Sequence, residues 1–66
     1  MKTNFVVMCA NDEEARHVMR LLKTYSFSRV VFQEGTLIGF YTLSLLCINE
    51  IRNLVGPENI IVTANE

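Results

Sequence analysis

The 66-residue chain is predicted to fold as one α+β domain of βαββαβ order, in which two helices cover one face of a four-stranded antiparallel sheet. Short runs of β-branched and aromatic residues alternate with two segments of helical periodicity. Residues that favour turns and helix caps fall between these segments, and no repeat or linker interrupts them. We therefore expect a single domain spanning residues 1–66.

The first strand and the first helix are predicted from the amino-terminal third of the chain. Residues 4–10 form a continuous apolar run, typical of a buried strand. Asn11 ends this run and, with Glu14 three residues later, gives the capping-box pattern of a helix start. Apolar residues then recur at helical spacing from Ala15 to Tyr25, with charged residues on the other faces. This pattern predicts an amphipathic helix.

The middle of the chain has the composition of a β-hairpin. Residues 27–33 and residues 37–43 are rich in aromatic and β-branched side chains. Glu34-Gly35-Thr36 separates them and is typical of a tight turn. Two antiparallel strands are therefore expected here.

The last third predicts a second helix and a short fourth strand. Ser44 is a suitable N-cap for a helix over residues 45–55, and Gly56-Pro57 is a typical stop signal. Residues 60–63 have strand composition and too little length for another helix. The resulting order is that of a ferredoxin-like two-layer sandwich, with the first and third strands in the centre of the sheet.

One face of such a sheet lies opposite the helices, and strand parity predicts which side chains it carries. Alternation along the two strands of the hairpin predicts that four side chains point toward the helices: Val30, Phe32, Ile38 and Phe40. For the first strand it leaves two choices open, in which either Phe5 and Val7 or Val6 and Met8 face away. Both choices leave an apolar cluster that marks an interface. The predicted partner-binding residues are Phe27, Arg29, Val31, Gln33, Leu37 and Tyr41.

Composition and charge limit the function. Half of the residues are hydrophobic, more than the core of so small a domain easily hides, which favours a partner or self-association. The formal net charge of −1 gives little attraction to nucleic acid. The apolar runs are too short for a signal peptide or a membrane span, so we expect an intracellular, cytoplasmic protein. Cys9 and Cys47 are expected to be reduced thiols.

Few residues of the sequence have the character of catalytic groups. His17 has Glu13 one helical turn away, a pair that we interpret as solvated helix surface. Cys47 is surrounded in sequence by apolar residues and is expected to be a buried structural thiol. The spacing of metal ligands and the glycine-rich turns that bind phosphate are both missing from the sequence. We therefore predict no catalytic residues, no metal and no cofactor.

The expected function is that of a small non-enzymatic adaptor, regulator or inhibitor that binds a protein surface through the apolar sheet face or an edge strand, as a homodimer. A phage- or plasmid-encoded inhibitor is one example of this class. Two alternatives share the element order. The element order resembles that of RNA-recognition domains, and Phe5 and Tyr41 would then stack on bases, although Phe40 and Tyr41 are adjacent and point to opposite faces. It also resembles ACT-type domains, which would imply a small ligand at a dimer interface.

Overall fold

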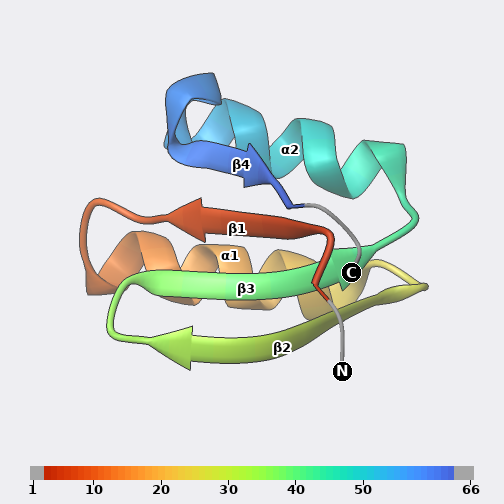
Figure 1. The fold of residues 1–66 in the computed structure, drawn as a ribbon, viewed down its shortest axis with the longest axis horizontal. Helices are drawn as coiled ribbons and strands as arrows, with labels where there is room; N and C mark the ends of the chain where they lie inside the picture. Colours follow the sequence, from red (N-terminus) through yellow and green to blue (C-terminus); the bar gives the residue numbers. More distant parts are fainter. Residues whose placement is uncertain (1–2, 64–66) are drawn as a thin grey trace.

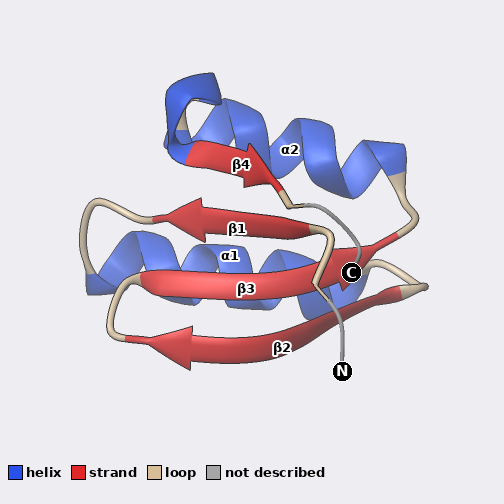
Figure 2. Cartoon of the chain, viewed as in Figure 1, coloured by secondary structure: helices blue, strands red, loops and turns tan. Residues whose placement is uncertain are grey.

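The computed structural model describes residues 3–63. The chain forms a four-stranded antiparallel sheet and two α-helices, which confirms the predicted α+β class (Figures 1 and 2). The elements in chain order are β1 (Phe5–Met8), α1 (Asp12–Thr24), β2 (Ser28–Glu34), β3 (Leu37–Thr42), α2 (Leu45–Val55), a 3₁₀ turn (Pro57–Asn59) and β4 (Ile60–Val62).

The strands lie in the order β2-β3-β1-β4, so β3 and β1 are central and β2 and β4 form the two edges. Every neighbouring pair is antiparallel. In Figure 1, α1 lies behind the sheet and α2 runs along its β4 side. The helix over residues 45–55 has the predicted bounds, whereas β1 and β4 are shorter than predicted.

Both helices begin at the predicted caps. The Asn11 side chain accepts a hydrogen bond of 2.9 Å from the Glu14 N–H, and the Ser44 hydroxyl accepts one of 3.2 Å from the Cys47 N–H. Gly56 ends α2 with a positive φ of 93°, a conformation that glycine adopts without a steric penalty. These local signals explain why the element order was predictable from the sequence.

The core lies between the sheet and the two helices. On β1 the buried residues are Phe5 and Val7, which settles the choice that the sequence left open, so Val6 and Met8 face away from the helices. The Phe5 and Phe40 rings stack in this core with their centroids 5.6 Å apart. The fully enclosed apolar side chains are Val7, Val18, Leu22, Ile38, Phe40, Cys47 and Ile51.

A β-bulge in β2 changes the predicted parity of that strand. Val30 pairs with Phe40, but Phe32 pairs with Gly39, so Val31 is an extra residue between the two pairs. The prediction that Phe32 points at the helices was therefore wrong, since its partner Gly39 lies on the opposite face from Ile38 and Phe40. The bulge also turns Gln33 to the helix side of the sheet, beside α1. The prediction had placed Gln33 on the open face, so this prediction was wrong as well.

Candidate protein interface

The sheet face opposite the helices, here called the open face, carries three rows of side chains. Residues paired across neighbouring strands share a face, so the strand register assigns each row. The middle row crosses all four strands and consists of Phe32, Gly39, Val6 and Ile61. On one side lies the Glu34 row, formed by Glu34, Leu37 and Met8. On the other side lies the Arg29 row, formed by Arg29 and Tyr41.

The middle row is entirely apolar and closely packed around a glycine. A Cβ atom added to Gly39 would overlap the Phe32 ring, so the ring lies directly over the glycine backbone. An aromatic ring in this position covers backbone that glycine alone would leave open to water. Phe32 still exposes 39% of its surface and Ile61 exposes 59%. The row is therefore a continuous apolar strip with ample surface left for a partner.

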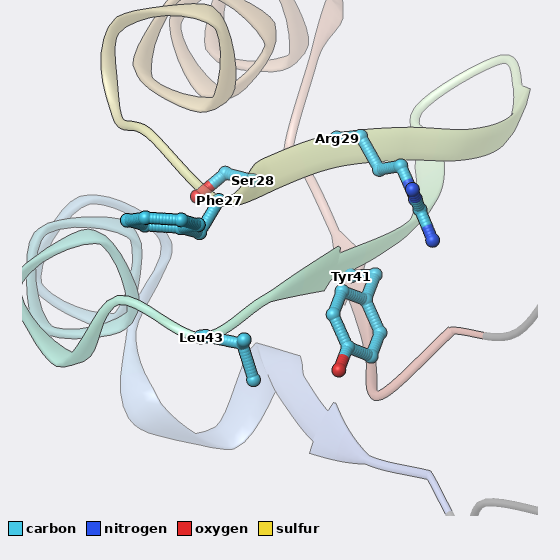
Figure 3. Close-up of a pocket in the computed structure, with 5 residues that line it drawn as sticks. All are labelled: Phe27, Ser28, Arg29, Tyr41 and Leu43. Atoms are coloured by element: carbon cyan, nitrogen blue, oxygen red, sulfur yellow. The ribbon is translucent and has the colours of Figure 1, made fainter.

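The Arg29 row borders a shallow pocket of about 240 Å³ (Figure 3). The Arg29 guanidinium lies 5.4 Å from the centroid of the Tyr41 ring, within the range of a cation–π interaction. Phe27 and Leu43 supply the apolar wall at the end of the sheet. Arg29 is the one charged group among the described residues that line this pocket, which gives the pocket a positive rim.

Hydrogen bonds behind the pocket hold its walls in place. The Asn4 side chain donates to the Thr42 carbonyl at 2.7 Å and accepts from the Thr42 N–H at 3.0 Å. The Ser28 and Thr42 hydroxyls lie 2.5 Å apart, and Thr42 is buried. The Leu43 N–H donates to the Phe27 carbonyl at 3.2 Å. The pocket is thus built on a fixed backbone, which lowers the entropy cost of binding.

The structure brings together some of the predicted partner-binding residues and separates others. Phe27, Arg29 and Tyr41 line one pocket, and Leu37 lies two rows away on the same open face. Val31 is the extra residue of the bulge and is partly buried. The Gln33 amide donates instead to the Gly35 carbonyl at 3.1 Å.

The sequence prediction placed Phe27 on the open face by strand alternation. In the structure, the backbone conformation of the turn before β2 sets the position of Phe27 instead. It lies in the turn before β2 with a φ of 63°, in the left-handed region that large side chains rarely adopt. Such a conformation costs about 1–3 kcal/mol, and here it leaves 78% of the aromatic side chain exposed. Strongly exposed leucines accompany Phe27 at this end of the molecule: Leu43, Leu45 and Leu46.

Sequence reasoning missed the contribution of Phe32 to the open face, whereas it had placed Glu34 in the polar rim of the interface. Without the bulge, Arg29 and Glu34 would point to opposite faces, because they are five positions apart, an odd number, along the strand. The bulge adds one residue and places both on the open face, at opposite ends of β2. The β2 sequence carries no proline or glycine that would have marked this position.

The two cysteines are poor nucleophiles in this environment. Both are free and buried. Burial raises the pKa of the Cys47 thiol above its ordinary value, and hydrogen bonds with the Ser28 and Thr42 hydroxyls offset only part of this effect. Burial, with a smaller contribution from Glu14, also raises the pKa of Cys9. Both groups therefore remain neutral thiols near pH 7.

His17 is exposed on α1 and shares a depression with Glu13, Arg16 and Arg20. This is the charged helix surface that the sequence indicated. Within residues 3–63, no three His, Cys, Asp or Glu side chains lie close enough together to hold a metal ion. In the same part of the chain, no helix has the length and apolar character needed to cross a membrane.

Comparisons with protein-family models, curated proteins and solved structures give no significant match. The assignment of function therefore depends on the geometry of the open face itself.

Proposed function

We propose that this chain is a small non-enzymatic protein-binding module with a ferredoxin-like βαββαβ fold, which acts as an adaptor, regulator or inhibitor and associates as a homodimer through its open face. The observation that carries the proposal is the middle row, an apolar strip that crosses the whole sheet on the side away from the helices. Apolar faces of this extent on soluble domains are typical of interfaces.

The size of the open face is consistent with a weak homodimer. Four strands about 4.8 Å apart and three rows about 6.6 Å apart give a face of roughly 19 by 20 Å. Two such faces, each of about 380 Å², bury on the order of 800 Å² together, which is below the range of stable specific interfaces and within that of weak, transient ones. We therefore expect association in the micromolar range and not a permanent dimer.

The sheet edges are less suitable for association than the open face. β4 has only three residues, and the bulge at Val31 interrupts the regular edge of β2. Short edge strands and bulges are common devices that prevent edge-to-edge pairing. The sequence left open whether the chain associates through the sheet face or through an edge strand. The short and interrupted edges favour the open face.

The substitution Tyr41→Glu tests the proposal. Tyr41 is half-buried on the open face, so a carboxylate there should weaken self-association about tenfold or more while the circular dichroism spectrum stays unchanged. Light scattering from low micromolar to millimolar concentration measures the mass, and Tyr41→Phe is the matched control. The proposed homodimer is wrong if the unmodified chain keeps the mass of a monomer at millimolar concentration.

A second candidate function, binding of single-stranded nucleic acid, is favoured by one observation: Phe32 and Tyr41 both lie on the open face. Phe5, which the RNA-recognition resemblance required as a stacking platform, is instead buried against Phe40. Arg29 is the one cation in the three rows of the open face, so few phosphates would be neutralised.

We therefore expect a short single-stranded RNA to bind no tighter than high micromolar at physiological salt, as measured by fluorescence anisotropy. Sub-micromolar binding that weakens both with added salt and with Tyr41→Ala would reverse the ranking of the two functions. Tyr41→Phe again serves as the control, since it keeps the aromatic ring.

A further inference from the structure

The open face is self-complementary in a way that fixes how two copies would meet. We infer that the homodimer packs open face to open face about a two-fold axis that follows the middle row, so that Arg29 of each copy pairs with Glu34 of a second copy. This inference rests on the proposed function, because it specifies the geometry of the same surface. The occupant of the open face is then a second copy of this chain.

The first support is the symmetry of charge about the middle row. Arg29 pairs with Tyr41 at one end of β2, and Glu34 pairs with Leu37 at the other end. Tyr41 and Leu37 are each two residues from Gly39, so the two charges are equally far from the middle row. One copy therefore presents a cation and an anion at matched positions on either side of an apolar strip.

The second support is the distance between these charges within one chain. Leu37 and Tyr41 are four residues apart on β3, which separates the Arg29 and Glu34 rows by about 13 Å. The two side chains therefore belong to separate regions of the face. A second copy, turned so that its strands run antiparallel to those of the first, brings its Glu34 row over the Arg29 row, and the converse contact forms at the other end.

This orientation also matches apolar groups with apolar groups. Leu37 of the second copy lies over Tyr41 and the adjoining pocket, and the Phe32 rings meet at the two-fold axis. The opposite choice, an axis parallel to the strands, would place β2 over β4. Arg29 and Glu34 would then face the three-residue strand Ile60–Val62, whose own side chains carry no charge. Charge complementarity therefore selects the axis across the strands.

Charge reversal tests this geometry without any need to identify another ligand. Arg29→Glu makes both ends of the face acidic, and Glu34→Arg makes both ends basic. In each variant the two-fold axis brings like charges together twice, so we expect self-association to fall about 30-fold or more. The chain carrying both substitutions restores opposite pairs and should associate within a few-fold of the unmodified protein.

The decisive measurement uses a one-to-one mixture of the two single variants. In a mixed dimer, both acidic ends of the Arg29→Glu chain face the basic ends of the Glu34→Arg chain, so both contacts are restored between chains. Light scattering or native mass spectrometry should detect mixed dimers where neither variant alone dimerises. Circular dichroism of each variant shows that the fold is intact, and rescue in the mixture shows that the surfaces remain competent.

The outcomes separate this inference from the proposed function. If the unmodified chain dimerises and both single variants dimerise equally well, or if the mixture shows no rescue, the inferred register is wrong while binding through the open face still stands. An unmodified chain that remains a monomer at millimolar concentration overturns the homodimer and this geometry together.

Discussion

Replacing Phe40 with alanine is expected to lower the free energy of unfolding by about 3–5 kcal/mol, the range for large-to-small changes at enclosed aromatic sites. Phe40 is completely buried on the central strand β3 and stacks on Phe5. A domain of this length has only about 3–10 kcal/mol of stability in total. The variant should therefore lose a large share of this stability and unfold at a much lower urea concentration than the unmodified chain.

The matched control is Phe32→Ala, which removes the same atoms from the opposite face. Phe32 is 39% exposed and rests on Gly39, so its loss should cost only about 1 kcal/mol. Urea unfolding followed by circular dichroism measures both changes, at one fixed protein concentration because a dimer adds concentration-dependent stability. Similar losses for the two variants would contradict the assignment of Phe32 to the open face.

The element order was predictable because each boundary has a local cause. Asn11 and Ser44 accept hydrogen bonds from the backbone of their own helices, and Gly56 ends the second helix by its own conformational freedom. None of these signals needs a distant partner. The predicted bounds of β1 and β4 were less accurate. A strand extends only as far as the neighbouring strand supplies backbone groups for hydrogen bonds, and the local sequence does not show where that ends.

The register of β2 could not be predicted in the same way. A bulge is a property of two strands together, and the sequence around Val31 shows only a continuous apolar run. One unpaired residue was enough to reverse the expected orientation of Phe32 and Gln33. Because side chains alternate at every residue, the parity predictions for the part of β2 after the bulge were reversed, while those for β3 were not affected.

The candidate interface was accordingly predicted in part. Arg29 and Tyr41 lie before the bulge and share the open face, and Leu37 lies there because the parity of β3 is regular. Phe27 lines the same pocket for another reason, since the turn before β2 forces its backbone to a positive φ. The sequence interpretation assigned Glu34 to the turn and to the polar rim of the interface, and the strand register pairs it with Leu37 at the end of the open face.

The largest expected effect on association comes from Val6→Glu. Val6 lies in the middle row on the central strand β1, between Gly39 and Ile61. In the inferred dimer this row follows the two-fold axis, so the introduced carboxylate meets apolar surface and also approaches its own copy. Burying a charge without a partner and repelling a like charge both oppose assembly.

We expect Val6→Glu to weaken self-association about 100-fold or more, which corresponds to roughly 2.8 kcal/mol. The fold should survive, because Val6 points away from the helices, whereas the neighbouring Val7 is fully enclosed between sheet and helices. Val6→Lys should weaken association to a similar extent and Val6→Ile should preserve it, since the surface is apolar and selects against either charge. Sedimentation equilibrium measures the association constants, and circular dichroism checks the fold of each variant. If Val6→Glu self-associates as strongly as the unmodified chain, the middle row is not the contact surface, and neither the proposed homodimer nor its two-fold geometry holds.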